Sequence, residues 1–436
     1  MLADRIRGSL VGLAVGDALG APLEGLGAEE IAQRHGRVTG YVESPLDHPE
    51  KWRLPGLHTD DTQQALIVTE AILHTGRADP DLIVRQMVEL TEGPRSVPFG
   101  AHRGTGRSYR LSVMLMRREP RWSSGARNSA GIGASMRVAP VGLFFAGDDS
   151  AIRENASLSA LVTHTDPRGC LAACAVAYLA GRASRSFQRP FTSAELHGET
   201  LGFVRRAETW FMDVHGSRSH PGVRETYHQF GDALEAIAGA WQHGPSRVLA
   251  QILAKGNELA GTDLGHPCRG VALTGVIAAI YFFLRHTEHF RDALIDVVNA
   301  GGDTDSVGAI VGALCGAAGG EAAIPAEWRE GLRAYDQIRL RADALAGEPY
   351  KEHRIRPLAE FELELTLEED RERRAKFPPG TFPDAYEWEE PVYRAPEVEA
   401  EERVPEPRAE IPERRDRPAP PDRSDRSDRY RRRRRG

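Results

Sequence analysis

Two features that decide the fold of this chain occur together in one stretch, Gly302-Asp303-Thr304-Asp305-Ser306-Val307-Gly308-Ala309-Ile310-Val311-Gly312-Ala313-Leu314-Cys315-Gly316. Apolar residues at positions 307, 310, 311 and 314 follow the spacing of one helix face. Glycine at positions 308, 312 and 316 allows a second helix backbone to approach closely, despite its low helix propensity. The stretch therefore predicts a helix in a tight core, with two aspartates at its start.

The same helical pattern extends over roughly the first 345 residues. Gly8, Gly12 and Gly16 repeat the four-residue glycine spacing near the start of the chain, and convincing alternating strands are scarce. The predicted fold class is all-α, a compact bundle of many helices. Two further helix faces are Ala65, Val68, Thr69 and Ile72, and Phe290, Ala293, Leu294 and Val297.

Composition divides the chain into three predicted regions. Residues 1–345 form the helical domain, residues 346–395 a charged and partly ordered extension, and residues 396–436 a disordered tail rich in proline and arginine. Within the extension, apolar residues at 361, 363, 365 and 367 alternate with polar ones, which favours a strand. Segment 181–224 is polar and less regular, as expected of an insertion that covers one face of the core.

The tail ends in five consecutive arginines, 431–435. One interpretation is an arm that binds nucleic acid, an acidic protein or a membrane surface. The other is a solvated tail whose charge is partly offset by nearby aspartates. The sequence leaves both interpretations open, and neither gives the tail a part in catalysis.

The overall composition excludes several classes of protein. A formal net charge of −7 argues against a protein that coats nucleic acid, and 41% hydrophobic residues suffice for a substantial core. The longest apolar stretch, 271–284, is shorter than the roughly 20 residues that span a bilayer, so a buried helix and no membrane span are expected. The apolar run 8–16 imitates a secretory signal, but Asp17 interrupts it and a buried helix is expected there too. Four cysteines without paired ligand spacing fit a reducing cytoplasm.

Two short acidic motifs carry the predicted chemistry, Thr59-Asp60-Asp61-Thr62 and Asp303-Thr304-Asp305-Ser306. Each stands where a helix pattern begins, so each is also a plausible helix N-cap. Capping needs a single aspartate or hydroxyl, whereas each motif supplies two carboxylates and a hydroxyl. Four carboxylates meeting at one site repel each other unless cations lie between them, and oxygen ligands of this kind suit Mg²⁺ or Mn²⁺. The sequence thus favours a binuclear metal centre.

Several separated motifs follow one another in the order of a known family: Gly12 to Glu24, His58 to Gln63, Met136 to Gly142, Thr163-His164, and Gly301 to Ser306. On these motifs, roughly residues 1 to 345 resemble the ADP-ribosylglycohydrolase family, all-helical hydrolases that include enzymes removing ADP-ribose from modified dinitrogenase reductase. The resemblance implies an orthogonal helical bundle. It also implies two Mg²⁺ or Mn²⁺ ions, with ligands from Thr59, Asp60, Asp61, Asp303, Asp305 and Ser306.

The resemblance further implies roles around the metals. Glu24, Asp60, Asp61 and Asp303 are the candidate catalytic acids, although Glu24 in isolation reads as a surface residue after a proline turn. Gly131, Gly133, Ser135 and His164 are the candidate substrate-binding residues, in and near a glycine-rich run that suits a diphosphate. Two positions depart from the family pattern. Ser306 replaces a common threonine but keeps the hydroxyl, and Ile132 replaces a common asparagine, which removes one polar contact. Arg137 either pairs with phosphate or braces the loop.

The reaction implied is hydrolysis of the glycosidic bond at ribose C1″ of an ADP-ribosylated protein or small molecule, with release of ADP-ribose. Two alternatives from other classes stand beside it. The chain is alternatively a non-catalytic, crystallin-like relative that binds ADP-ribose, or a binuclear metal phosphohydrolase acting on nucleotides. The intact acidic motifs argue against the first, and the lack of histidine-rich ligand motifs argues against the second.

Overall fold

The computed structural model describes residues 1–287, 289–350 and 353–387. Helices make up nearly all of the regular structure in these residues, and the only named strand among them is the short β1 (Pro98–Ala101). The predicted all-α fold is confirmed.

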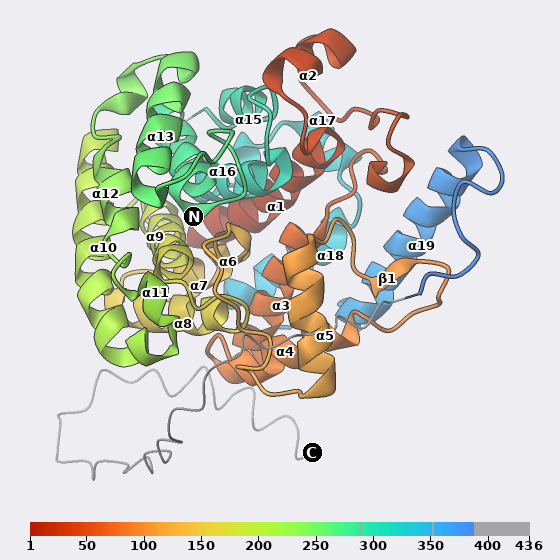
Figure 1. Ribbon diagram of the computed structural model, residues 1–436, viewed down its shortest axis with the longest axis horizontal. Coiled ribbons are helices and arrows are strands. Elements are labelled where there is room, and N and C mark those ends of the chain that lie inside the picture. Colours follow the sequence, from red (N-terminus) through yellow and green to blue (C-terminus); the bar gives the residue numbers. More distant parts are fainter. Residues whose placement is uncertain (288, 351–352, 388–436) are drawn as a thin grey trace. The chain divides into compact units, whose positions relative to one another are not determined.

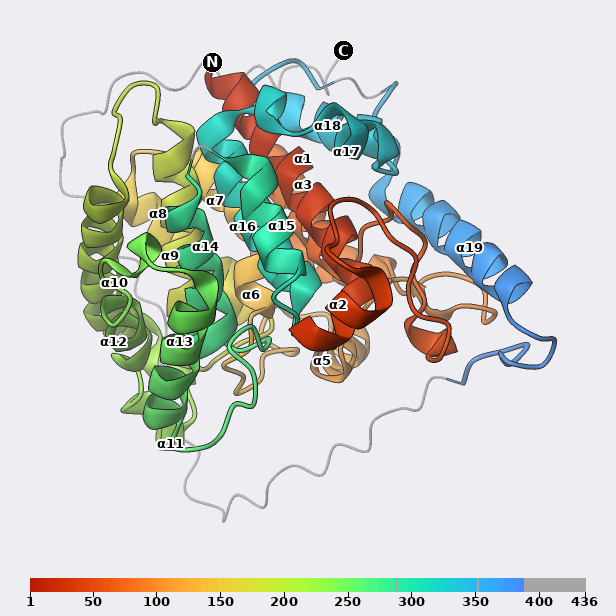
Figure 2. The same cartoon turned by 90° about the horizontal axis from the view of Figure 1, so that it is seen from above.

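Helices α1 (Leu2–Gly20) and α16 (Thr304–Gly319) lie side by side at the centre of the fold (Figures 1 and 2). A Cβ added to Gly12 would lie 2.3 Å from the carbonyl oxygen of Gly312, so the two backbones are in direct contact. The helices are antiparallel, and we call their contact line the glycine seam: Gly8 against Gly316, Gly12 against Gly312, and Gly16 against Gly308. The close helix approach predicted from the glycine spacing is therefore present.

Several helices pack around this central pair, among them α3 (Asp60–Thr75), α7 (Ala139–Phe144) and α9 (Pro167–Ser184). One outer side of the fold is formed by α10 (Ser193–His215), α12 (Gln229–Glu235) and α13 (Pro245–Ala260), and the opposite side carries β1 and α19 (Leu358–Lys376) (Figure 1). Helix α5 (Arg107–Arg118) lies nearer the middle (Figure 1). The remaining helices are α2 (Ala28–His35), α4 (Pro80–Glu89), α6 (Gly133–Met136), α8 (Asp149–Leu161), α11 (Pro221–Arg224), α14 (Ile277–Arg285), α15 (Phe290–Val298), α17 (Ala326–Gly331) and α18 (Tyr335–Leu345).

The apolar stretches predicted to be core helices are buried. Residues 272–276 form a π-helical turn that continues into α14, and every residue from Ala272 to Leu284 is buried. Helix α1 is buried throughout from Gly8 to Gly20, with Asp17 inside it. In the part of the chain that the structure describes, no helix has the length and apolar character needed to cross a membrane.

Two predictions of local structure are wrong. The residues predicted to form a strand lie in α19. Their alternation was misleading because Glu362 is fully buried in ion pairs whereas Leu367 is 38% exposed, so polarity does not mark the outer face of this helix. The segment predicted to be irregular contains α10, a regular helix of 23 residues that begins with a capping box between Thr192 and Glu195.

The extension as far as α19 belongs to the same compact unit as the preceding helices. A domain boundary near residue 345 stays a prediction. The predictions made for residues 396–436, and for the extension beyond residue 387, lie outside the described residues.

Candidate active site

The end of α1 and the segment after it lie against the start of α16. The hydroxyl of Thr304 donates to the carbonyl oxygen of Gly20 (2.8 Å), and the N–H of Gly25 donates to the carbonyl oxygen of Gly302 (2.8 Å). Gly302 has a φ of 85°, a conformation that favours glycine and sharply turns the chain before the second acidic motif. These contacts bring Glu24 and the second motif together from opposite ends of the sequence.

The first acidic motif is fixed to α1 by the buried carboxylate of Asp17. Its Oδ2 accepts hydrogen bonds from the N–H (3.0 Å) and the hydroxyl (2.6 Å) of Thr62 in the first turn of α3. Thr59 binds the same carboxylate. One helix therefore holds both motifs, because α1 packs along α16 by its glycines and binds the start of α3 by its aspartate.

The capping interpretation of the two motifs is not supported. Thr59 and Asp303 occupy the N-cap positions of α3 and α16, yet neither side chain makes a capping hydrogen bond. Elsewhere in the chain, Asp79, Asp148 and Asp166 do cap their helices with side-chain bonds. The hydroxyl of Thr59 instead donates to Asp17 (2.9 Å), and the N–H of Ser306 donates to Oδ1 of Asp305 (3.0 Å).

Electrostatics show that the acidic side chains converge. Repulsion from Asp305 is the main cause that raises the pKa of Glu24 to about 7, although this residue is exposed at the surface. Burial, followed by repulsion from Asp305, raises the pKa of Asp60 to about 8. Burial raises the pKa of Asp303 to about 6, and burial with neighbouring carboxylates also raises the pKa values of Asp61 and Asp305. Five acidic groups from three parts of the chain thus lie within electrostatic reach of one another.

The donors gathered at this acidic centre fit a hard divalent cation. Oδ1 of Asp61 is buried without a hydrogen-bond partner, and its Oδ2 lies 3.1 Å from the hydroxyl oxygen of Thr59. A buried carboxylate oxygen without a partner is costly, and Mg²⁺ or Mn²⁺ would compensate it. As the side chains stand, no three His, Cys, Asp or Glu residues in the described ranges are close enough to enclose an ion. The donor chemistry therefore fits the ions, whereas a closed ligand cage is not preformed.

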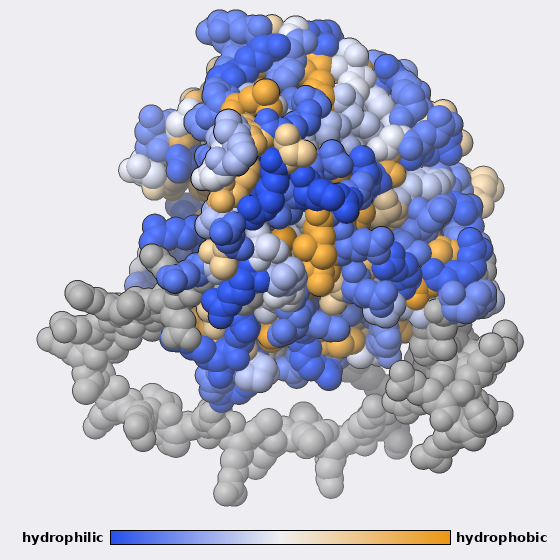
Figure 3. Space-filling view, turned by 90° about the vertical axis from the view of Figure 1, so that its right-hand side faces the viewer, coloured by the Kyte–Doolittle hydropathy of each residue, from blue (hydrophilic) through white to orange (hydrophobic). Residues whose placement is uncertain are grey.

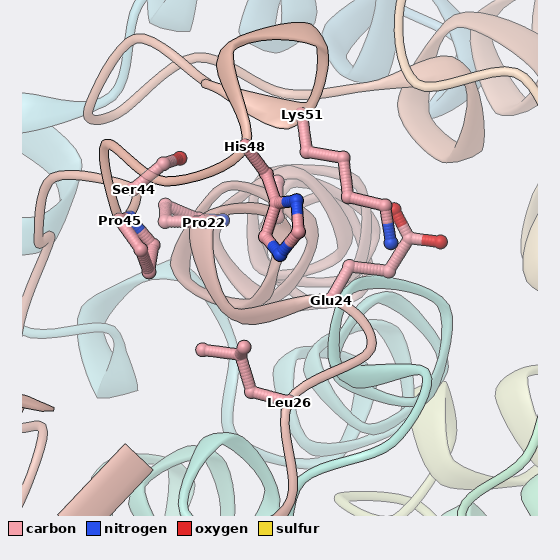
Figure 4. A pocket seen from close by; sticks show the side chains of 8 residues that line it. Pro22, Glu24, Leu26, Ser44, Pro45, His48 and Lys51 are labelled. Atoms are coloured by element: carbon pink, nitrogen blue, oxygen red, sulfur yellow. The ribbon is translucent and has the colours of Figure 1, made fainter. Parts of the chain in front are cut away.

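Glu24 also lines a pocket (Figure 4). The side chains of Glu24 and Lys51 are directed toward each other across it. Lys51 and Arg53 lower the pKa of Glu24, but less than Asp305 and burial raise it. The lining consists of Ala21, Pro22, Glu24, Leu26, Ser44, Pro45, His48 and Lys51.

A chain of buried hydrogen bonds joins the first motif to the predicted substrate segment. The side-chain amide of Gln64 donates to Asp60 (2.7 Å), and its carbonyl oxygen accepts from Arg137 (2.7 Å). Arg137 also donates to the hydroxyl of Thr163 (2.7 Å), which lies 2.7 Å from Nδ1 of His164. Arg137 is fully buried, so of its two interpretations the structure supports bracing.

Three of the four candidate substrate residues lie together. A Cβ added to Gly131 or to Gly133 would lie 3.4 Å from the ring of His164, so the ring fits against both glycines. Burial lowers the pKa of His164 to about 3, which keeps the ring neutral. Ser135 lies in the following turn, buried, with a hydroxyl that has no hydrogen-bond partner.

This loop also lies next to the second acidic motif. The N–H of Ile132 donates to the carbonyl oxygen of Gly270 (3.1 Å). A Cβ added to Gly270 would lie 2.2 Å from Oδ2 of Asp303, so Gly270 lies directly against that carboxylate. The loop with the predicted substrate residues and the second acidic motif thus lie next to each other.

Several residues of this site were missed by the sequence interpretation. Asp17 and Gln64 have supporting roles, and His58 is bound by Glu362 of α19 (3.0 Å). Asp17 could have been found, because a lone aspartate within a buried apolar helix needs partners. Gln64 and Glu362 carry no comparable signal, since each looks like an ordinary polar residue of a helix.

Comparisons with known proteins show which family the chain belongs to. The sequence model of one family, described as ADP-ribosylglycohydrolase, matches residues 1–354. A protein of Archaeoglobus fulgidus is 30% identical over 336 residues, covering 76% of this chain and 92% of the relative. The ADP-ribosyl-[dinitrogen reductase] glycohydrolase of Rhodospirillum rubrum is 28% identical over 356 residues, covering 78% and 95%. A solved structure of an ADP-ribosylglycohydrolase-related protein complex aligns with a TM-score of 0.55 at 25% identity, over 79% of this chain and 97% of that one.

Fold, site and relatives together define the class of protein, an all-helical hydrolase of glycosidic bonds. The chain belongs to the ADP-ribosylglycohydrolase family. Membership supports hydrolysis of ADP-ribose linkages as its reaction class and confirms the resemblance drawn from the motifs.

Proposed function

We propose that this protein hydrolyses the glycosidic bond at ribose C1″ of an ADP-ribosylated protein or small molecule and releases ADP-ribose. One observation carries the proposal: Glu24 and the two acidic motifs converge, next to the loop that holds Gly131 and Gly133. The site thus combines carboxylates for the ribose end of the substrate with a glycine-rich backbone for its diphosphate.

The reaction is proposed to need two Mg²⁺ or Mn²⁺ ions. When bound, the ions would supply Lewis-acid polarisation and orient the ribose hydroxyls and the attacking water. The proposed ligands are Thr59, Asp60, Asp61, Asp303, Asp305 and Ser306, whose carboxylates and hydroxyls suit such ions.

The chain's own carboxylates have two further tasks. One must accept a proton from the attacking water, and Glu24, Asp60, Asp61 and Asp303 are the candidates. Glu24 is the best placed of these, since it is the one of the four that lines the pocket. The others would stabilise the positive charge that develops on the ribose as the glycosidic bond breaks.

The binding groups for the rest of the substrate come from the braced loop. Backbone groups at Gly131 and Gly133 would face the diphosphate, where a side chain would hinder close approach. His164, neutral and fixed by Thr163, would contact the ADP-ribose moiety by hydrogen bonding. Ser135 would use the hydroxyl that has no partner in the protein.

Location and tail are also proposals. Free, buried cysteines at all four positions fit action in the cytoplasm. The arginine-rich tail is proposed to bind an acidic partner or nucleic acid, independently of the catalytic site.

The test is a panel of substrates in which ADP-ribose is joined to arginine, serine, an acetyl group, nucleic acid or a small metabolite. Each is incubated with the metal-depleted protein, with and without Mg²⁺ or Mn²⁺, and products are identified by mass spectrometry. Release of free ADP-ribose from at least one substrate, only with metal, is expected. Release of phosphate instead would assign a phosphohydrolase, and binding of ADP-ribose without turnover would assign a binding protein.

A further inference from the structure

Helix α19 places an acidic side chain in the interior, behind the first acidic motif. Glu362 is fully buried, although it lies beyond residue 354, where the match to the family ends. Its carboxylate lies 3.0 Å from Nε2 of His58 and accepts a hydrogen bond from the side-chain amide of Gln63 (2.8 Å). Arg103 forms an ion pair with it.

The partners of Glu362 flank the proposed metal ligands directly. His58 precedes Thr59, and Gln63 lies in the first turns of α3. Arg103 adds two bonds to the same segment, because its Nε donates to the carbonyl oxygen of His58 (3.0 Å) and its N–H donates to the side chain of Gln63 (3.2 Å). The residues on both sides of the first motif are thus held by a single buried cluster.

A second residue of α19 completes this cluster. The hydroxyl of Thr366 accepts from Nη1 of Arg103 (2.9 Å) and donates to the carbonyl oxygen of Ala101 at the end of β1 (2.7 Å). The following turn packs on the first motif, since a Cβ added to Gly104 would lie 2.7 Å from Cβ of Thr59. Helix α19 therefore fixes the turn that lies against a proposed ligand.

The two faces of α19 differ in their role. Its outward face belongs to a largely hydrophilic side of the molecule (Figure 3). Glu362 has no exposed surface from which to contact substrate, so it can influence the site only through His58, Gln63 and Arg103. A buried carboxylate with this many donors is a rigid anchor, because losing any one donor is costly.

We propose that Glu362 is a positioning residue that holds the segment from His58 to Gln63 so that Thr59, Asp60 and Asp61 are oriented to bind metal. The inference rests on the proposed function. It assigns to α19, outside the region matched by the family, control over the metal affinity of the site.

The test compares Glu362→Gln with Glu70→Gln. Like Glu362, Glu70 forms a buried ion pair, with Nε of Arg341 at 2.8 Å. It lies on α3, the helix that begins at the first motif, but more than two turns along the helix from that motif. Both substitutions leave a buried arginine without its charged partner, so similar losses of thermal stability are expected. Only Glu362→Gln is expected to weaken Mn²⁺ binding, by about 10- to 100-fold, measured from the free-Mn²⁺ electron paramagnetic resonance signal.

A second measurement needs no metal. Hydrogen exchange of the peptide covering residues 57–64 in metal-free protein should be faster in Glu362→Gln than in Glu70→Gln. Equal Mn²⁺ affinity and equal exchange in the two variants would overturn the inference while leaving the proposed function intact. Failure of the wild-type protein to bind Mn²⁺ would instead overturn the metal-dependent function, and the inference with it.

A milder variant covers the case in which Glu362→Gln does not fold. Thr366→Val removes one bond to Arg103 without leaving a buried charge unpaired. A weakening of Mn²⁺ affinity in the same direction, about 3- to 10-fold, is expected because the cluster is loosened and not broken. Unchanged affinity and unchanged exchange of residues 57–64 in Thr366→Val would also overturn the inference.

Discussion

The carboxylate of Asp17 accepts two hydrogen bonds from Thr59, one from its N–H (2.9 Å) and one from its hydroxyl (2.9 Å). Thr59 is also a proposed metal ligand. Asp17, which fixes it, lies in α1, whereas Thr59 stands at the start of α3. Burial raises the pKa of Asp17, while His58 and the bonds from Thr62 and Thr59 oppose that shift. The position of the first motif therefore depends on a buried acid in α1.

Asp17→Asn should destabilise the protein by about 2 kcal/mol, because the amide group would face a backbone N–H of Thr59 or Thr62 and leave it unsatisfied. Urea unfolding in the presence of a chelator measures this loss. The matched control is Asp79→Asn at the N-cap of α4, where asparagine caps as well as aspartate, and a change under about 0.5 kcal/mol is expected. Equal stability of both variants would contradict the anchoring role of Asp17.

Gly12→Ala should destabilise the protein by about 2 kcal/mol or more, because the new methyl group would meet the backbone of Gly312 at 2.3 Å and the ring of Phe290 at 2.9 Å. Gly198→Ala is the control. This glycine is exposed in α10 with nothing within 4 Å of an added Cβ, so the substitution should stabilise by about 0.5 kcal/mol. Thermal unfolding of the two variants should thus shift in opposite directions, and parallel shifts would disprove the close contact at Gly12.

The double variant Asp303→Asn, Asp305→Asn should lose metal-dependent release of ADP-ribose but keep its fold. Asp305 is buried and Asp303 half-buried, and both carboxyl groups have raised pKa values, so removing their charge should not lower the stability of the metal-free protein. Saturating Mn²⁺ should raise the melting temperature of the wild type and not that of the variant. A second pair of neighbouring aspartates, Asp148 and Asp149 at the start of α8, provides the control, since their double asparagine variant should keep the full metal response.

The stability of the protein should fall in acid partly because of His102. Burial lowers the pKa of this histidine to about 4, and its Nε2 lies 2.9 Å from the carbonyl oxygen of Met87. The unfolded chain takes up the proton below about pH 6.5 and the folded chain does not, so this stability is present above pH 6.5 and is lost as the pH falls toward 4. His102→Gln keeps a donor for Met87 and should lose about 2 kcal/mol less than the wild type between pH 7 and 4.5 in urea unfolding. An identical loss in both proteins would show that His102 is protonated in the fold.

Much of the fold follows from the sequence because its signals are local. The glycine spacing in α1 and α16 predicts their close contact, and the apolar run of α14 predicts its burial. The two acidic motifs could be named without a structure because each combines its ligand types within a few residues. Their convergence with Glu24 needed either the family resemblance or the fold itself, since nothing local relates residue 24 to residue 303.

The supporting residues could not be predicted for the same reason. Glu362 and Arg103 are ordinary charged residues in sequence, and they become interior groups only because each finds the other across the fold. The same ion pair explains why a strand was wrongly expected at α19. Some polar residues of this helix are buried in ion pairs and do not face solvent. The secondary structure of α19 therefore depends on tertiary contacts that the periodicity of the sequence does not show.

The direct backbone contact between α1 and α16 has a consequence for how this protein can change over time. Surfaces lined by large side chains tolerate drift, because one substitution can be offset by another nearby. Where the backbones of α1 and α16 touch, a substitution cannot be offset by a change in a neighbouring side chain. The distance between the end of α1 and the start of α16 is therefore expected to stay constant during evolution. Side chains elsewhere can therefore change in descendants of this sequence while the spacing between α1 and α16 stays the same.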